Sequence, residues 1–147
     1  MGCLPPLAAA ERLAVGASFS GVFEETSDGQ WRGLAVDVLR QLAASAGDTI
    51  RFKMYPWPRA LAMVEQGQAD ILIGPYRSPE RENLYAFFEL PFYRDRVIFY
   101  ARQDSVVRWS GDLSALRSQR IAAIRGWHYG AEFARARSLL NLSVIPQ

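Results

Sequence analysis

The sequence predicts an α/β fold in which a largely parallel sheet is flanked by helices. Segments with the two-residue period of strands alternate with segments of helical period along the first half of the chain. One apolar run, Ala69–Ile73, is continuous and bounded by turn residues, as expected of a parallel strand covered on both faces. Half of the 147 residues are hydrophobic and 12% are aromatic, which is sufficient for a folded core.

Local patterns place the first strand and the first helix. The segment "RLAVGA" at Arg12–Ala17 alternates and ends in small residues, which predicts a strand. Asp28 and Gly29 signal a turn. Apolar residues then recur at helical spacing through Ala35–Ala46, and Gly47 ends this predicted helix.

Two further strands enclose a second helix. Thr49–Tyr55 alternates as a strand, and Pro58–Gln66 is a predicted helix that begins at its proline and ends before Gly67. Ala69–Ile73 forms the third strand. Ligands of βαβ sheets collect beyond the carboxyl ends of the strands, so a site is expected directly after these strands.

A second α/β unit is expected after a long strand at Arg96–Arg102. A short helix precedes the strand "RIAAI", a turn follows at Gly126, a helix begins near Gly130, and "LSVIPQ" adds a strand. The roughly 45 residues after Arg102 are too few for an independent α/β layer. The predicted parts are a signal-peptide remnant at 1–10, a first lobe at 11–101, and a hinge with an incomplete second lobe at 102–147.

The N-terminal segment "MGCLPPLAAAERL" is small and apolar and ends in three alanines, as the last part of a secretory signal does. A disordered, alanine-rich N-terminus is the alternative interpretation. If the segment is a signal, the mature chain starts near Glu11 and loses Cys3.

Charge and composition exclude several classes of function. Sixteen arginines and Lys53 are interspersed among 15 acidic residues, so no basic stripe for nucleic acid is indicated. One cysteine and one histidine provide neither an internal disulfide nor a metal cluster, and no cofactor is implied. No apolar run approaches the ~18 residues of a membrane span.

The turn "GPYRSPER" at Gly74–Arg81 is the strongest candidate site. It follows the carboxyl end of the third strand and combines two arginines, a tyrosine and two prolines. A guanidinium binds a carboxylate through two parallel hydrogen bonds, so this turn suits an anionic group of a small ligand.

A series of motifs in this order resembles the extracytoplasmic solute-binding proteins of amino-acid ABC transporters. The motifs are "GLAVDV" at Gly33–Val38, "GQAD" at Gly67–Asp70, "SPER" at Ser78–Arg81, "LPFY" at Leu90–Tyr93 and "GWHYG" at Gly126–Gly130. The resemblance covers about Glu11 to Gln147. It implies a periplasmic-binding-protein-like (type II) fold of two α/β lobes that close on a ligand.

The resemblance also implies a set of ligand-binding residues. Arg81 matches the arginine that binds the ligand carboxylate, Trp57 an aromatic wall of the pocket, and Phe19 another ring after the first strand. His128 falls where the second lobe offers a hydroxyl, beside the start of a helix. The expected set is completed by Pro75, Tyr76 and Trp127.

Three departures from the family pattern affect this set. The segment from Asp70 to Arg81 is one residue shorter than is typical, and Pro75 and Tyr76 replace small hydroxyl residues, which suggests a narrower or more aromatic pocket. Family members also continue for about a hundred residues, and that part usually supplies the acid that holds the ligand amine. At most part of a site is therefore expected.

Other interpretations of the same residues stay open. Arg81 could pair with neighbouring glutamates on a wet surface, and Trp57 could belong to the core. Arg59 and Arg77 are read as solvated, and Leu84–Tyr93 as mostly packing.

The leading functional hypothesis is a non-catalytic periplasmic protein of a Gram-negative bacterium that delivers an amino-acid-like or other small carboxylate to an ABC permease. The alternatives are an enzyme resembling cyclohexadienyl dehydratases and a ligand-sensing domain of a membrane receptor. Glu24, Glu25 and His128 are the available acid–base groups and form no recognisable pair. Self-association of the chain is also expected, through an open strand edge.

Overall fold

The computed structural model describes residues 9–146, so residues 1–8 of the predicted signal remnant, with Cys3, lie outside the described residues. The chain divides into two compact units, one ending at Phe92 and the other beginning at Tyr93. This division falls earlier in the chain than the one expected after residue 101.

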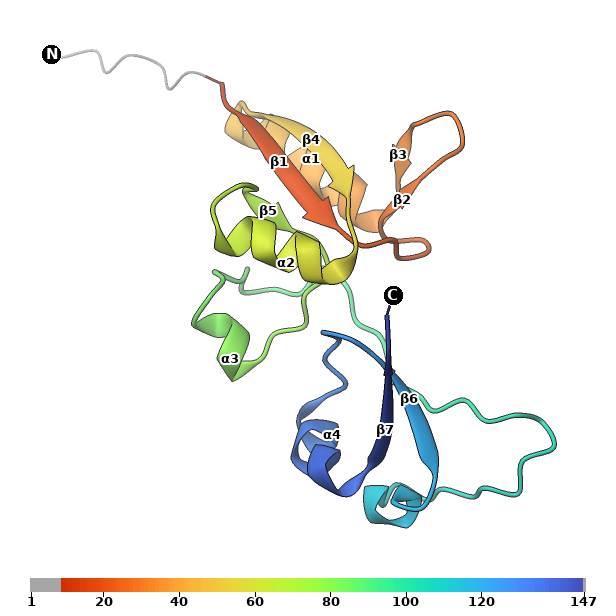
Figure 1. Ribbon diagram of the computed structural model, residues 1–147. Helices are drawn as coiled ribbons and strands as arrows, with labels where there is room; N and C mark the ends of the chain where they lie inside the picture. The colour runs from red at the N-terminus through yellow and green to blue at the C-terminus, as the bar shows by residue number, and fades with distance from the viewer. Residues whose placement is uncertain (1–8, 147) are drawn as a thin grey trace, which may run out of the picture. The chain divides into compact units, whose positions relative to one another are not determined.

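The first unit is built on a parallel three-stranded sheet, as predicted (Figure 1). Its strands are β1 (Glu11–Gly16), β4 (Thr49–Met54) and β5 (Ile71–Leu72), in the order β4-β1-β5. β1 pairs along its whole length with β4, whereas β5 pairs with β1 only at Ala14 and Val15. The third predicted strand is therefore present but much shorter than the apolar run that predicted it.

Two helices cover opposite faces of this sheet (Figure 1). Helix α1 (Leu34–Ala46) ends at Gly47, which adopts a left-handed conformation with φ of 74°. Helix α2 (Trp57–Glu65) carries a proline in its first turn. Alternate residues of β1 face the two helices: Ala14 packs with the α1 residues and Val15 packs with the α2 residues. Both predicted helices are confirmed within about one residue at each end.

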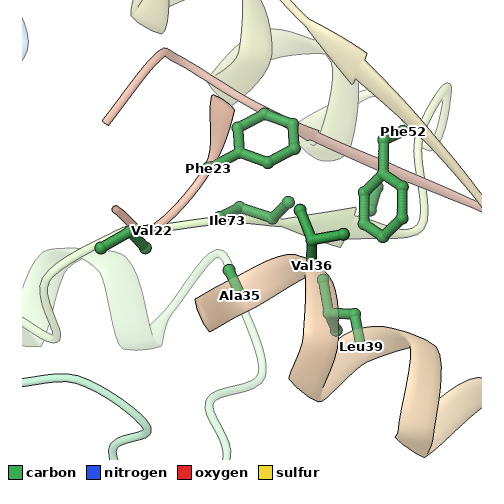
Figure 2. Packing of buried hydrophobic residues seen from close by; sticks show 8 residues of the cluster. Val22, Phe23, Ala35, Val36, Leu39, Phe52 and Ile73 are labelled. Carbon is green, nitrogen blue, oxygen red and sulfur yellow. The ribbon is translucent and has the colours of Figure 1, made fainter. Parts of the chain in front are cut away.

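The larger core cluster lies between α1 and the sheet (Figure 2). Phe23, which is fully buried, stacks on Trp31 with ring centroids 5.0 Å apart and lies 6.1 Å from the Phe52 ring. Trp31 comes from a small antiparallel hairpin of β2 (Glu24–Glu25) and β3 (Trp31–Arg32), which forms around the predicted turn at Gly29. The hairpin thus closes one side of this core.

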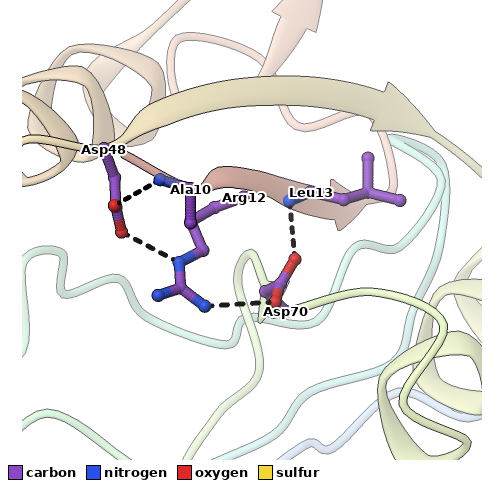
Figure 3. A network of polar contacts seen from close by, with 5 residues as sticks. All are labelled: Ala10, Arg12, Leu13, Asp48 and Asp70. Atoms are coloured by element: carbon purple, nitrogen blue, oxygen red, sulfur yellow. Dashed lines mark hydrogen bonds and ion pairs between the residues drawn. The ribbon is translucent and has the colours of Figure 1, made fainter. Parts of the chain in front are cut away.

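A network of ion pairs and hydrogen bonds connects the strands at the amino end of the sheet (Figure 3). Arg12 lies between Asp48, which directly precedes β4, and Asp70, which directly precedes β5. The backbone amides of Ala10 and Leu13 donate to the same two carboxylates, at 2.9 and 2.8 Å. All three strands are therefore linked at this end.

The second unit contains a parallel pair of strands, β6 (Arg120–Ile124) and β7 (Asn141–Ile145). Between them lie α4 (Ala131–Ala136) and a short 3-10 segment, η2 (Arg137–Leu139), and another, η1 (Leu113–Leu116), precedes β6. Its core is formed by Leu116, Phe133 and Leu140. The predicted order of short helix, strand, turn, helix and strand is confirmed.

The prediction of a strand at Arg96–Arg102 is wrong. No residue in this segment belongs to a strand, and within residues 9–146 it pairs with none of the described strands. Val97 and Tyr100 are exposed, whereas Phe99 packs against Trp109 at 4.9 Å between ring centroids. An alternating pattern specifies a strand only where a partner strand satisfies its backbone groups.

Candidate ligand-binding site

The candidate site lies at the carboxyl edge of the first sheet. Because β1, β4 and β5 run parallel, their ends at Gly16, Met54 and Leu72 meet at one edge. Each strand is followed by a predicted site residue: Phe19 after β1, Trp57 after β4, and the turn with Arg81 after β5. The topology alone therefore gathers most of the predicted set at the edge where α/β sheets bind ligands.

A buried serine shapes the turn after β5. Ser78 is 6% exposed and caps a single helical turn, α3 (Pro79–Glu82), and its Oγ accepts a hydrogen bond from the backbone N–H of Arg81 at 3.4 Å. Its carbonyl accepts from the N–H of Glu82 at 2.9 Å. Serine at the N-cap followed by proline is a favourable way to start a helical turn. The cap therefore favours the helical turn that carries Arg81.

The Arg81 guanidinium is half-buried between the turn and α2. Its Nη1 donates to the carbonyl oxygen of Tyr76 at 3.1 Å, and its Cζ lies 5.7 Å from the centroid of the Trp57 ring. Burial lowers the pKa of Arg81, and the nearby Tyr85 and Glu80 oppose that shift. Arginine stays protonated at neutral pH, so the site holds a partly desolvated cation.

The aromatic residues of the predicted set differ in exposure. Trp57 is only 6% exposed, so most of its ring belongs to the packing of the first unit and one face meets Arg81. Tyr76 and Phe19 are both 37% exposed, and Pro75 between β5 and the turn is half-buried. Phe19 exchanges two backbone hydrogen bonds with Phe23, at 2.9 and 2.8 Å, which ties its loop to the core.

Trp127 and His128 belong to the second unit. Trp127 is 37% exposed, and its ring centroid lies 6.3 Å from that of Tyr129. His128 is half-buried and lies shortly before α4, as its predicted position beside a helix start requires. The Tyr129 hydroxyl accepts a hydrogen bond from the backbone N–H of Ile124 at 2.7 Å, which holds this turn against β6.

Several other charged groups of the first unit have partners within that unit, and Arg59 and Arg77 are exposed, as predicted. Arg77 forms an ion pair with Glu82 at 2.5 Å and Arg59 lies 4.6 Å from the centroid of the Tyr55 ring. Glu24 pairs across the hairpin with Arg32 at 3.1 Å. A hydrogen bond from Ser20 is the main cause that lowers the pKa of Glu24, which therefore stays ionised and is poorly suited to act as a general acid.

The sequence analysis did not single out three residues that shape the Arg81 turn or contact it. Ser78 could have been found, because a serine directly before a proline is an N-cap signal. Tyr85 and Glu65 could not: the Tyr85 hydroxyl donates a short hydrogen bond to the Glu65 carboxylate, across twenty residues of sequence. The expectation that Leu84–Tyr93 is mostly packing is wrong for Leu84, Phe88 and Leu90, which are largely exposed.

A shallow hollow of about 340 Å³ lies on the second unit, between η1 and α4. Asp112, Leu113, Glu132 and Arg135 are among its lining residues, and it contains none of the predicted site residues. Asp112 caps η1 by accepting from the N–H of Ser114 at 2.8 Å. The hollow is therefore not part of the candidate site.

In residues 9–146, histidine, cysteine and carboxylate side chains nowhere gather into a group that could hold a metal ion. Over the same range, no helix combines the length and the apolar character needed to cross a bilayer.

The fold is that of the periplasmic-binding-protein-like α/β proteins, represented by part of their full length. The chain belongs to the bacterial extracellular solute-binding proteins, family 3, which it matches over residues 13–136. No curated protein matches it at a significant level.

Solved structures share the fold at low sequence identity. An amino acid ABC transporter substrate-binding protein from Streptococcus pneumoniae Canada MDR_19A, bound to L-arginine, is 19% identical with a TM-score of 0.74, and the match covers 93% of this chain and 58% of that one. A truncated, arginine-bound ArgBP from T. maritima is 15% identical with a TM-score of 0.69, over 92% and 63% of the two chains.

A third structure is an ancestral amino acid-binding protein described as a precursor of cyclohexadienyl dehydratase. It is 17% identical with a TM-score of 0.61, over 93% of this chain and 60% of that one. The present chain thus spans about 60% of the length of the structures that it matches.

Proposed function

We propose that this chain binds a small solute carrying a carboxylate, of the amino-acid type, in the periplasm of a Gram-negative bacterium for delivery to an ABC permease. The observation that carries the proposal is the position of Arg81: a partly desolvated guanidinium at the carboxyl edge of a parallel sheet, facing Trp57. Membership of the solute-binding family supports the same function.

The chemistry at this edge favours a carboxylate. A guanidinium offers paired donors that match the two oxygens of a carboxylate, and partial desolvation strengthens such hydrogen bonds. The carbonyl of Tyr76 and the Trp57 ring restrict the orientation of the guanidinium. Tyr76 and Phe19 expose ring surface at the same edge of the sheet and would contact the apolar part of the solute.

Trp127 and His128 stay proposed contributors from the second unit. Solute-binding proteins close two domains around a ligand, and residues before a helix of the second domain would then complete the contacts to the solute. The solute itself is proposed only as a class, because these contacts set its identity. The arginine-bound state of two similar structures makes L-arginine a reasonable first probe.

A catalytic role is not favoured. A dehydratase needs a positioned acid or base, and a hydrogen bond from Ser20 is the main cause that lowers the pKa of Glu24 and keeps this carboxylate ionised. Glu24 also pairs with Arg32 across the hairpin. We therefore expect no turnover of prephenate or arogenate by the purified chain. Measurable turnover that is lost in a Glu24→Gln variant would replace the binding function with an enzymatic one.

The binding function is tested by titrating the ¹⁵N-labelled chain with L-arginine and following amide shifts, which detect weak as well as strong binding. Arg81→Ala should weaken binding by about 1.5–3 kcal/mol, the range for hydrogen bonds to charged groups. Arg77→Ala is the matched control, because Arg77 lies in the same turn but pairs with Glu82. Equal affinities for the two variants would contradict the assignment of Arg81 as the carboxylate anchor.

A further inference from the structure

The turn that carries Arg81 is too short to hold its own shape. Helix α3 contains only four residues, Pro79–Glu82, and isolated helices of this length are unstable in water. The position of the Arg81 guanidinium must therefore depend on contacts made by the turn with other elements. The contacts with α2 are the relevant ones, because α2 belongs to the packed part of the first unit.

The turn meets α2 at both ends of that helix. At the first residue of α2, the Trp57 ring lies under the Arg81 guanidinium. At its last residue, the Glu65 carboxylate accepts the short hydrogen bond from the Tyr85 hydroxyl. With nine residues in α2, these two attachments are separated by about 12 Å at 1.5 Å per residue. Two separated attachments restrict rotation of the turn, which a single one would not.

Tyr85 is directly connected to the backbone of Arg81. The N–H of Tyr85 donates to the carbonyl oxygen of Arg81 at 2.8 Å, and the N–H of Leu84 donates to the same oxygen at 3.0 Å. A displacement of the Tyr85 ring would therefore move the peptide unit that follows Arg81. The phenol thus links the end of α2 to the anchor through one side chain and one backbone hydrogen bond.

The environment of Tyr85 suits a positioning role. Burial, followed by the hydrogen bond to Glu65, raises the pKa of the Tyr85 phenol, so the group stays a neutral donor at physiological pH. A neutral donor holds the Glu65 carboxylate without adding a second charge beside the Arg81 cation. Tyr85 therefore contributes to the position of Arg81 as a hydrogen-bond donor and not as a charge.

We infer that Tyr85 and Glu65 act together as positioning residues that hold the Arg81 guanidinium in its carboxylate-binding orientation. This inference rests on the proposed function of Arg81. It assigns to both residues a role in affinity for the carboxylate group in particular, distinct from a general contribution to folding.

The test compares two probes, L-arginine and L-argininamide, which share a side chain and differ only at the carboxylate. The variants are Tyr85→Phe, which removes the hydroxyl, and Glu65→Ala, which removes the acceptor. Glu65→Gln keeps a neutral acceptor and should restore most of the affinity. Tyr100→Phe is the matched control, because Tyr100 is 88% exposed.

Tyr85→Phe and Glu65→Ala should weaken L-arginine binding by about three- to tenfold and leave L-argininamide unchanged. The expected loss is smaller than for Arg81→Ala, because Tyr85 and Glu65 act on the ligand only through Arg81. In an Arg81→Ala background, Tyr85→Phe should have no further effect. A merely structural role would instead weaken both probes equally, and this result would overturn the inference.

A second readout requires no ligand. The side-chain N–H resonances of Arg81 and of the Trp57 indole report the orientation of the guanidinium over the ring. Both should shift in Tyr85→Phe and Glu65→Ala, remain near the parent positions in Glu65→Gln, and not move in Tyr100→Phe. Unchanged resonances in a folded Tyr85→Phe or Glu65→Ala variant would overturn the inference, whether or not the probes bind.

The two proposals fail in different ways. If Arg81→Ala leaves L-arginine affinity unchanged, the proposed anchor is wrong. If Arg81→Ala weakens binding but Tyr85→Phe and Glu65→Ala do not, the anchor stands and the positioning inference alone is wrong.

Discussion

The Arg12 guanidinium donates through Nε to the Asp48 carboxylate at 2.9 Å, at the end of the first sheet opposite to Arg81. The other oxygen of Asp48 accepts from the backbone N–H of Ala10 at 2.9 Å. Arg12 also approaches Asp70 at 3.6 Å, which links the start of β5 to the same cation. Ionic contacts thus hold the amino end of the sheet, and the candidate site lies at the carboxyl end.

These contacts predict a pH dependence of stability. The hydrogen bond from Ala10, followed by that from Arg12, lowers the pKa of Asp48 below its usual range. A carboxyl group with a lowered pKa in the folded state stabilises the fold above its unfolded pKa of about 3.9, and this contribution is lost as the pH falls through the folded pKa. The urea midpoint of the first unit should therefore fall on acidification below about pH 4.

Asp48→Asn should make this acid dependence shallower and lower the urea midpoint at neutral pH. The Trp31 indole resonance reports the first unit, because Trp31 packs against its core. Asp104→Asn is the control, because Asp104 and its partner Arg102 form an exposed ion pair, which contributes little. An acid dependence in Asp48→Asn as steep as in the parent chain would refute the role of Asp48.

We predict that a side chain added at Gly16, the last residue of β1, overpacks the core of the first unit. A Cβ at this position would lie 3.1 Å from the Cβ of Ile73 and 3.3 Å from the Phe23 ring. Both neighbours belong to the buried core, so Gly16→Ala should destabilise the first unit by about 1–3 kcal/mol, the range for overpacking. Urea unfolding checks this value, with Ser18→Ala at an exposed position of the following loop as the control. A urea midpoint equal to that of the parent chain would show that Ile73 and Phe23 move aside at little energetic cost.

We expect Trp57 to contribute more to the stability of the fold than to ligand affinity. Its ring is 6% exposed, so Trp57→Ala should lower the free energy of unfolding by about 3–5 kcal/mol. Trp57→Phe keeps much of the apolar volume and should weaken L-arginine binding by about 0.5–2 kcal/mol through a poorer cation–π contact with Arg81. Calorimetry and urea unfolding separate the two effects. If Trp57→Ala abolished ligand binding but left the free energy of unfolding unchanged, the ring would line the pocket and would not belong to the core.

Exposed apolar side chains around the unit boundary predict self-association. Those exposed by half or more in this stretch are Leu84, Phe88, Leu90, Val97, Ile98 and Tyr100. Such a concentration on one segment favours burial against a second copy of the chain. Sedimentation velocity over a wide concentration range should show a monomer–dimer equilibrium.

The double substitution Phe88→Ser with Leu90→Ser should shift this equilibrium toward the monomer. Leu139→Ser, a change at a 60% exposed leucine outside this segment, should leave it unaltered. A monomer at all concentrations in the parent chain would rule out the association.

Local patterns were sufficient for much of the secondary structure. The periodicity around Leu39 and the terminal Gly47 predict α1, and the continuous apolar run at Ile71 predicts a strand with both faces covered, because these features depend on residues close in sequence. The same reasoning failed at Phe99, where the alternating pattern is present but the described residues provide no partner strand. Strand formation depends on a second segment, which a local pattern does not contain.

For the candidate site, the sequence by itself determined that Arg81 and Trp57 each follow a strand of one parallel sheet. It could not determine how far each side chain is buried or what each contacts. Only the tertiary structure decided that Trp57 is mostly core, that Arg81 lies over its ring, and that Tyr85 meets Glu65 at the far end of α2. The physical reason is that periodicity and turn chemistry act between neighbours in sequence, whereas desolvation and side-chain contacts arise only when distant segments pack together.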